Sequence, residues 1–469
     1  MKKNRFNILT SVTLIFALMF GSCEKWIDPD VNLSENAPTD VTMALLLPST
    51  QAALFYVMGG DHSRAASIFM QHQAGVDRQA QAFDVYNYTE SDCNNLFNTL
   101  SATVMQNLLN LRTKSVEQKS PHFEGVANVL TAYTLGEMTD VWGDVPFYEA
   151  FKANLTGNRT PMYDAQQKLY VAIDSLLVAG ITKLQASESL YSPTATSDLI
   201  YKGDRTKWRR AAWTLRLRYA MHLAKRKGNL TDADAILANT SAIFITANAD
   251  DFQFVFGTPG AETGPRRNYE SNRGDIRAGK FIVDLMNATS DPRRGPYFTA
   301  ISGAYIGSGP GESRLTASRM GPFYGTANSP VLTLTNVEYQ FIVAEVRFKQ
   351  GTLAAAATAY NDAVRASLTK HGIVLTDPAV VTWLAANAAE TATTITLAKI
   401  MTAKYIGLYL QTQVWSDWRR TGLPDLPLAT GATEVAIPRR YPYPLNERLY
   451  NPNMPAGLTL LTRMYWDMQ

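Results

Sequence analysis

Two separated stretches of the sequence mix aromatic rings with side chains that form hydrogen bonds. The first contains Arg78, Asp84, Tyr86, Asn87 and Tyr88, and the second contains Tyr269, Arg273, Tyr297, Tyr305, Phe323 and Tyr324. Aromatic rings offer apolar surfaces on which the C–H faces of a sugar stack, and a few placed polar groups then hold its hydroxyls. The two stretches therefore predict non-covalent binding of a glycan, or of a peptide, which would use similar residues. The alternative is that these rings only anchor loops to the core.

A second kind of chemistry is indicated near the N-terminus, where a cysteine follows an apolar segment. Three basic residues precede an apolar run over residues 8–20, which has the length of a signal-peptide core and is shorter than a membrane span of ~20 residues. Two small residues then lead to Cys23, which resembles the acylated cysteine of bacterial lipoproteins, with Phe20 where leucine is usual. We therefore expect a lipoprotein signal peptide over residues 1–22, lipid on Cys23 and a flexible tether over residues 23–40. The alternative is an ordinary secretory signal followed by an unmodified cysteine.

Other reaction chemistry has no signature in the sequence. The five histidines lack metal-ligand spacing, and the chain contains no H-E-x-x-H, G-x-S-x-G, P-loop or dinucleotide fingerprint. We expect no metal, no cofactor and no catalytic residue, although the paired carboxylates of a glycosidase are defined by their separation in space and not by a sequence motif. The net charge of +3 gives no indication of a nucleic-acid partner. If Cys23 carries lipid, Cys93 has no intrachain partner, so we expect it to be a small buried hydrophobe.

The elements that must position these residues show mainly helical periodicity. Apolar side chains recur every three or four positions, and proline or aspartate stands at several expected helix starts. Helices are predicted at residues 41–57, 94–114, 121–141, 161–179, 204–227, 276–287, 337–350, 353–369 and 394–418, and strands only at 252–256 and 331–333. In the first helix, Leu45, Leu46, Ala53 and Tyr56 are expected to share one stripe. No linker divides the chain, which predicts one mostly α-helical domain over residues 41–469.

One predicted helix pair has the spacing of a tetratricopeptide hairpin. Its small and aromatic positions are Ala344, Gly351, Ala356, Tyr360 and Ala363. Small residues let two antiparallel helices approach closely, the glycine makes the turn, and the aromatic ring fills the groove between them. Other pairs match this pattern loosely, so we expect a degenerate array of tetratricopeptide-like pairs with long loop insertions. The loops at 258–271 and 291–329 carry interspersed aromatics, and those of the second, longer loop favour an ordered, functional loop over a disordered one.

Several short segments, in order along the whole chain, resemble one known family. They are residues 23–26 (CEKW), 140–146 (DVWGDVP), 201–208 (YKGDRTKW), 404–408 (KYIGL), 415–422 (WSDWRRTG) and 437–440 (IPRR). Together they resemble the SusD/RagB family of Bacteroidetes outer-membrane lipoproteins, in its SusD-like subgroup. The residue types in these segments favour a structural role over ligand contact.

The resemblance implies a fold, a location and a partner. Such proteins are single α-helical domains of tetratricopeptide-like pairs that sit on the outer leaflet of the outer membrane. They cap a TonB-dependent, SusC-like transporter and deliver a nutrient to it, commonly an oligosaccharide and sometimes a peptide, without catalysis. Their ligand lies on loops between the first helices and in the large insertion, which are the two regions rich in aromatic and polar residues here.

Three functional hypotheses follow from these observations. The leading one is a surface nutrient-binding lipoprotein that works with an outer-membrane transporter, its ligand being a glycan or a peptide. The second is a tetratricopeptide-type scaffold lipoprotein that assembles envelope proteins, against which the long aromatic loops argue. The third is a surface hydrolase, for which no local motif gives support.

Overall fold

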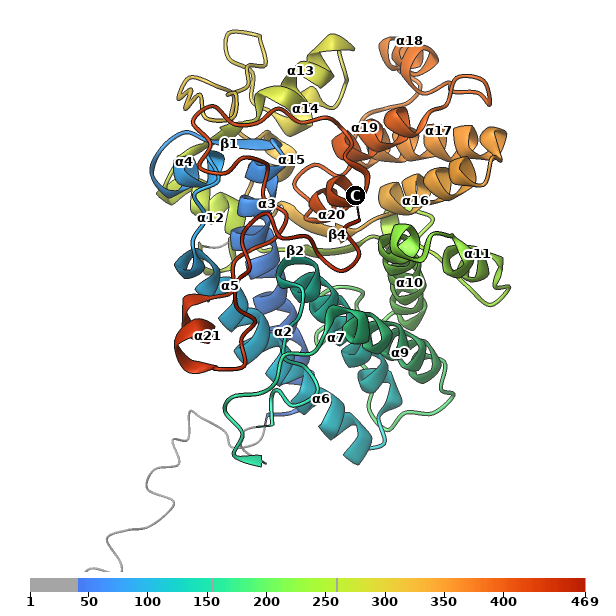
Figure 1. Ribbon diagram of the computed structural model, residues 1–469. Helices are drawn as coiled ribbons and strands as arrows, with labels where there is room; N and C mark the ends of the chain where they lie inside the picture. The colour runs from blue at the N-terminus through green and yellow to red at the C-terminus, as the bar shows by residue number, and fades with distance from the viewer. Residues whose placement is uncertain (1–40, 153–155, 259, 469) are drawn as a thin grey trace, which may run out of the picture.

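The computed structural model describes residues 41–152, 156–258 and 260–468, and this part of the chain is mostly helical (Figure 1). The predicted signal peptide, the lipidated Cys23 and the tether lie in residues 1–40, outside the described residues, and stay predictions. The helices pack around one continuous cluster of buried apolar side chains. The predicted mostly α-helical fold with little β structure is confirmed.

The first helical run is the spine of the core. It consists of α2 (Met43–Val57), the π-helical turn η1 (Met58–His62) and α3 (Ser63–Phe69). By length and hydropathy this run would be able to cross a membrane, but 56% of its most apolar window is buried inside the protein, which is typical of a core helix.

The buried stripe of α2 differs from the predicted one. Leu47, Leu54 and Phe55 are fully buried, whereas Leu45 is 64% exposed and Tyr56 is 44% exposed. Apolar residues stand next to one another along α2, so periodicity alone did not identify which neighbour faces the core. The expectation that Leu45 and Tyr56 share the buried stripe was therefore wrong.

A packed group of helices follows along the chain. Its members are α5 (Asn94–Asn98), the π-helical turn η3 (Thr99–Met105), α6 (Gln106–Glu117), α7 (Pro121–Trp142), α9 (Gln166–Leu184) and α10 (Arg205–Lys227). Helices α7 and α9 approach closely at Gly125 and Gly180. A Cβ on Gly125 would lie only 2.6 Å from the Cγ of Leu184. Asp204 caps α10 as expected, because its carboxylate accepts hydrogen bonds from two backbone N–H groups of the first turn.

Helix α9 begins at Gln166 and not at Pro161 as predicted. The segment before it forms a bridge in which Val145 pairs with Asp164. The carboxylate of Asp164 also accepts a hydrogen bond from the backbone N–H of Phe147 at 2.9 Å. These non-local contacts hold the residues after Pro161 in an extended conformation.

The predicted tetratricopeptide-like hairpin is confirmed in α16 (Asn336–Lys349) and α17 (Leu353–Lys370). Gly351 makes the turn with a φ of +76°, and the rings of Phe341 and Tyr360 meet edge to face at 6.1 Å. The following predicted helix over residues 394–418 is instead two helices, α19 (Leu397–Gly407) and α20 (Gln413–Thr421). Leu410 between them has a φ of 61°, which no α-helix accommodates.

Two small antiparallel sheets join distant parts of the chain. Strand β1 (Gln73–Gly75) pairs with β3 (Ile276–Ala278), and β2 (Phe252–Val255) pairs with β4 (Pro330–Leu334). Strands β2 and β4 were predicted, but β3 occupies the start of the predicted helix 276–287. The shorter helices are α4 (Arg78–Asp84), α11 (Thr231–Ala238), α12 (Pro265–Asn272), α13 (Lys280–Ala288), α14 (Arg294–Tyr297), α15 (Pro322–Gly325), α18 (Pro378–Asn387) and α21 (Leu445–Tyr450).

Candidate functional site

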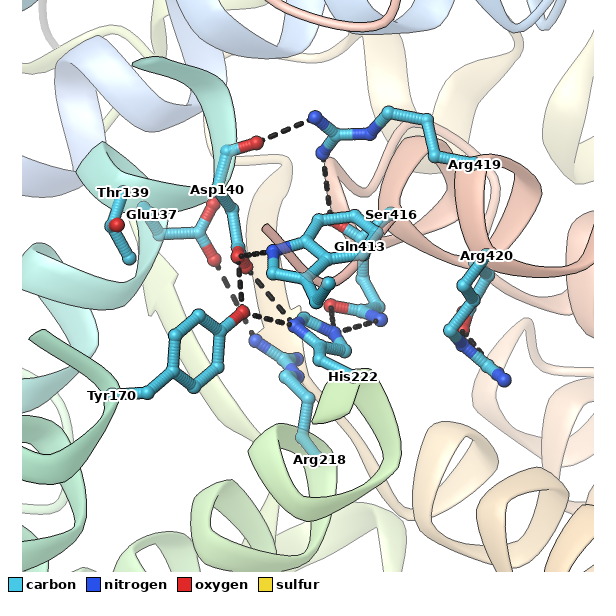
Figure 2. Close-up of polar contacts among 12 residues, drawn as sticks. Glu137, Thr139, Asp140, Tyr170, Arg218, His222, Gln413, Ser416, Arg419 and Arg420 are labelled. Atoms are coloured by element: carbon cyan, nitrogen blue, oxygen red, sulfur yellow. Dashed lines mark hydrogen bonds and ion pairs between the residues drawn. The ribbon is translucent and has the colours of Figure 1, made fainter. Parts of the chain in front are cut away.

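A buried polar network joins α7, α9, α10 and α20 (Figure 2). At its centre the carboxylate of Asp140 accepts hydrogen bonds from Tyr170 Oη at 2.5 Å and Trp466 Nε1 at 3.0 Å, and it lies 3.3 Å from His222 Nδ1. Burial alone would raise the pKa of Asp140, but His222 and Tyr170 outweigh burial and hold that pKa below its usual value. Asp140 is therefore an ionised acceptor shared by three elements.

A second centre of the network surrounds Arg218 on α10. Its guanidinium donates to the two carboxylate oxygens of Glu338 at 2.7 Å and 2.6 Å, and lies 3.6 Å from Glu137 Oε1. All three side chains are buried. Burial alone would lower the pKa of Arg218, whereas the two carboxylates raise it, so Arg218 keeps its charge inside the core.

A third centre lies at α20, in the segment WSDWRRTG. Arg420 donates to both carboxylate oxygens of Glu345 at 2.5 Å and to Asp417 Oδ1 at 2.7 Å, and Lys404 Nζ lies 2.8 Å from Asp417 Oδ2. Burial would raise the pKa of Glu345, but Arg420 and a neighbouring lysine lower it further than burial raises it. This centre ties α20 to α16 and α19.

The network has the residue types of acid–base chemistry but not the access that such chemistry needs. A glycosidase needs one protonated and one ionised carboxyl group that both reach the substrate. Glu137 and Asp140 are 7% and 5% exposed, and both are paired with cationic or hydrogen-bonding partners. The network therefore holds helices together, which agrees with the structural role predicted for its segments. In the described ranges, no cluster of three or more His, Cys, Asp or Glu side chains is arranged to hold a metal ion.

The two stretches with candidate ligand residues are brought together by the β1–β3 sheet. Arg78 Nη1 lies 3.4 Å from the carbonyl oxygen of Arg273, and Gln81 Nε2 donates to Ser313 Oγ at 2.8 Å. Helices α4 and α12 and the loop of residues 291–329 thus surround one small sheet (Figure 1). We call the surface formed by residues 78–88, 265–273 and 291–329 the loop face.

Three predicted ligand residues of the first stretch are buried under the loop face. The carboxylate of Asp84 accepts hydrogen bonds from the backbone N–H groups of Gly75 and Gly311, at 3.1 Å and 2.5 Å, and so joins β1 to the long loop. Burial raises the pKa of Asp84 to about 7, against the lowering effect of those two hydrogen bonds. Tyr86 and Tyr88 are 1% and 5% exposed, which leaves neither ring a face for a ligand in this conformation.

Two tyrosines of the second stretch are also buried. The ring of Tyr297 stacks on Tyr409 at 4.7 Å, and its hydroxyl donates to the carbonyl oxygen of Ile406 at 3.0 Å. The hydroxyl of Tyr324 lies 2.9 Å from His371 Nε2. In this conformation both rings pin the long loop to α17 and α19, which is the alternative role that the sequence left open.

The remaining predicted ligand residues reach solvent. Arg78, Asn87 and Arg273 are exposed, and Tyr269, Tyr305 and Phe323 are half-buried. The guanidinium of Arg64 lies over the ring of Tyr269, 4.2 Å from its centre. The hydroxyl of Tyr269 donates a hydrogen bond to the carboxylate of Asp275 at 3.2 Å. The structure brings Arg78, Arg273 and Tyr269 together at one end of the loop face. Tyr305 lies next to α14 and Phe323 next to the end of α17.

A groove beside α2 contains residues that sequence analysis did not select. Its volume is about 1030 Å³, and its lining includes Tyr56, Asn95, Thr99 and Phe256. No sequence signal identifies it, because the periodicity of α2 does not show that the ring of Tyr56 stands outside the buried stripe.

Comparison with known proteins places the chain in a family. Residues 35–444 match the family model for SusD-like proteins, described as starch-binding and associating with the outer membrane. No curated protein matches the chain significantly.

Solved structures share the fold at low sequence identity. A chitin-binding protein is 23% identical, with 91% of this chain and 100% of that chain covered and a TM-score of 0.76. A SusD/RagB family protein from Bacteroides thetaiotaomicron is 23% identical, with 88% and 95% covered and a TM-score of 0.73. A chitin-binding SusD homolog from Flavobacterium johnsoniae is 21% identical, with 90% and 98% covered and a TM-score of 0.75. Because the family model spans most of the sequence, the chain belongs to the SusD-like family of starch-binding, outer-membrane-associated proteins.

Proposed function

We propose that this protein is a surface lipoprotein that binds an oligosaccharide and delivers it to a TonB-dependent, SusC-like transporter of the outer membrane. The observation that carries the proposal is the convergence of two distant stretches at the β1–β3 sheet, where accessible rings and polar side chains share the loop face. The description of the family as starch-binding and outer-membrane-associated supports the ligand class and the location. The chain acts as a binding protein and not as an enzyme in this proposal.

The accessible residues of the loop face are the proposed ligand contacts. Tyr269, Tyr305 and Phe323 offer ring surface, and Arg78, Asn87 and Arg273 offer hydrogen bonds to hydroxyls. Asp84, Tyr86, Tyr88, Tyr297 and Tyr324 hold the loops that carry those contacts. Sugar binding to this face is tested by titration with chitohexaose and maltohexaose, and peptide binding by titration with a tryptic digest of casein. Binding of the digest alone would make the ligand a peptide.

The transporter is tested by capture from native membranes. The full-length protein, extracted in a mild detergent, is expected to co-purify with a large β-barrel protein of the TonB-dependent class. Repeated recovery of the protein without such a barrel would reject delivery to a transporter, and stable capture of other envelope proteins without any sugar ligand would favour the scaffold hypothesis.

Membrane attachment is tested at Cys23. Two signals are usually needed for stable anchoring by lipid, and a lipoprotein with several acyl chains meets that need. Cys23→Ala is expected to release the protein into the soluble fraction of cells that lack the transporter, whereas Cys93→Ala is not, because Cys93 is buried. Retention of Cys23→Ala on membranes without the transporter would reject the anchor, and with it the role of residues 23–40 as a tether that lets the domain move over its partner.

A further inference from the structure

The groove beside α2 is built from two parallel stripes of residues. One stripe lies on the first helical run and contains Ala52, Tyr56 and Gly60, and the other lies on α5 and η3 and contains Asn95, Thr99 and Thr103. In both stripes the residues are four positions apart and so face the same side. The alanine and glycine leave the floor of the groove open, because they project little or no side chain between the two helices.

An aromatic corner closes one side of the groove. The rings of Tyr56 and Phe256 meet edge to face with 6.1 Å between their centres, and Val255 beside them is 55% exposed. The Tyr56 hydroxyl accepts a hydrogen bond from Asn268 Nδ2 at 2.8 Å, which fixes the ring in place. A fixed, half-exposed ring is the kind of surface on which the C–H face of a sugar stacks at a small cost in conformational entropy.

The opposite stripe offers hydrogen bonds that the protein does not use. Within the described part of the chain, the side chains of Asn95, Thr99 and Thr103 form no hydrogen bond, although all three line the groove. Their groups are an amide and two hydroxyls, which both donate and accept. Such neutral groups match the hydroxyls of a sugar.

The charge of the groove is small. Lys202 and Glu262 stand at its edge with opposite signs, and Asp61 is paired with Arg64 at 2.7 Å. An anionic or cationic ligand would therefore find no net attraction here, whereas a neutral ligand needs none and can replace its lost hydrogen bonds to water with bonds to the amide and hydroxyls of the groove. The volume of about 1030 Å³ is at the upper end of the ~300–1,000 Å³ of ligand pockets, which suits an oligosaccharide better than a single sugar.

Both π-helical turns of this region contribute to the groove. Gly60 and Asp61 belong to η1, and Thr99 and Thr103 belong to η3. A π-turn inserts a residue into a helix, gives up regular geometry, and is frequently found at functional sites. Two such turns on facing helices, each directing residues toward the same open space, are an observation independent of the aromatic corner.

From this geometry we propose that the groove is a second binding site for a neutral oligosaccharide, which adjoins the loop face at α12 through Asn268 but is lined by other residues. The sugar stacks on Tyr56 and Phe256 and is held by Asn95, Thr99 and Thr103. The proposal shares with the proposed function only the assumption that the protein binds glycans; it does not depend on the loop face or on the transporter. A chain of sugars that dissociates from the loop face would then still be retained by the protein.

The test follows individual rings by ¹⁹F NMR of the full-length protein labelled with 3-fluorotyrosine. Signals of Tyr56, Tyr269, Tyr305 and Tyr191 are assigned by single Tyr→Phe substitutions. Tyr191 is 53% exposed, like Tyr56, but does not line the groove, and so is the matched control. The probes are chitohexaose, maltohexaose and cellohexaose, with a tryptic digest of casein as a peptide probe.

At least one hexasaccharide is expected to shift the Tyr56 signal to a plateau as its concentration rises, while the Tyr191 signal stays in place. Thr99→Val keeps the shape of the side chain and removes the hydroxyl, so the affinity read from Tyr56 is expected to fall about 2- to 12-fold. The affinity read from Tyr305 is expected to stay unchanged in the same variant. Ser101→Ala, on the same helix but outside the groove lining, serves as the control substitution.

The remaining outcomes distinguish failure of the second site from failure of the proposed function. Shifts at Tyr269 or Tyr305 without a shift at Tyr56 would overturn the second site and leave the proposed function intact. A shift at Tyr56 alone would support the groove and remove the loop face from the proposed function. A Tyr56 signal that responds only to the peptide digest, or to no probe, would overturn the assignment of the groove to neutral oligosaccharides.

Discussion

The buried network and the loop face contain the same residue types in opposite environments. Arg218 in the network is 1% exposed and bonded to Glu338, whereas Arg273 on the loop face is exposed and its guanidinium forms no hydrogen bond with the described residues. The same contrast occurs within one loop, where Tyr297 is fully buried and Tyr305 is half-buried. Residue type alone therefore does not locate the binding site; access to solvent separates the charges and rings that hold the fold from those free to meet a ligand.

The largest expected effect comes from the network. Glu338→Ala leaves Arg218 buried with one carboxylate, that of Glu137 at 3.6 Å, and the carbonyl oxygen of Thr333 as its partners. Breaking a buried ion pair by removing one partner typically costs about 3–5 kcal/mol, so we expect a loss of that size in the free energy of unfolding measured in urea. Asp284→Ala is the control, because Asp284 forms an exposed pair with Lys280 that is worth less than about 1 kcal/mol. Similar losses in the two variants would contradict the contrast between buried and exposed charges.

A second prediction compares two tyrosines of the same loop. Tyr297→Ala removes a buried ring that stacks on Tyr409 and is expected to lower the free energy of unfolding by about 3–5 kcal/mol. Tyr305→Ala removes a half-buried ring and is expected to cost about 1 kcal/mol. Thermal unfolding followed by circular dichroism measures both. An equal loss would mean that Tyr305 also anchors the loop, which would remove it from the proposed ligand contacts.

A third prediction concerns pH and the core beneath the loop face. Burial lowers the pKa of His72 to about 3, and its ring accepts a hydrogen bond from the backbone N–H of Leu410 at 3.1 Å. Below the unfolded pKa of 6.5 the unfolded chain binds a proton that the folded chain does not, so stability falls as the pH falls from 6.5 toward 3. This single group should lower the free energy of unfolding by about 2 kcal/mol between pH 7 and pH 5.

The free energy of unfolding is measured at pH 7 and pH 5 for the wild type and for His72→Gln. The change between the two pH values is then compared between the two proteins. The variant should be less stable at pH 7, because it replaces the buried ring of His72. Because glutamine does not titrate, the variant should lose less stability on acidification. His371 has a pKa lowered by burial to about 3 as well and gives the same slope in both proteins, which cancels in the comparison. Parallel pH profiles would show that His72 is not the group responsible.

Much of the fold was predictable because its determinants are local. Pro121 opens α7, Asp204 caps α10, and Gly351 turns the hairpin between α16 and α17. Two of the errors occur where distant contacts prevail. Ile276 begins a strand because β1 pairs with it, and the helix predicted to start at Pro161 begins later because Asp164 pairs with Val145.

The candidate site was predictable as two regions but not as a set of contacts. The mixture of rings and polar side chains identified the two stretches that β1 and β3 bring together. Which of these residues reach solvent depends on the packing of α17 and α19 beneath the loop, which the sequence of the loop does not contain. The groove was not predicted, because Tyr56 was interpreted as part of the core stripe of α2.

The smallest expected effect is on ligand affinity at the loop face. An aromatic stack contributes about 0.5–1.5 kcal/mol beyond the area it buries, so Tyr269→Ala and Tyr305→Ala should each weaken chitohexaose or maltohexaose about 2- to 12-fold. Tyr297→Phe is the control: it removes a buried hydroxyl bonded to Ile406 and leaves both accessible rings in place. Isothermal titration should show unchanged affinity for that variant even though its stability falls.

This last comparison separates access from residue type most directly, since all three substitutions change tyrosines of the same predicted site. If Tyr297→Phe weakened binding as much as Tyr305→Ala, the Tyr297 hydroxyl would have to leave the carbonyl oxygen of Ile406 in the bound state, and the loop would rearrange on binding. If neither accessible ring affected affinity while Tyr56 did, binding would occur in the groove and not on the loop face. The effects of these three substitutions and of a change at Tyr56 together identify which surface of the protein meets the sugar.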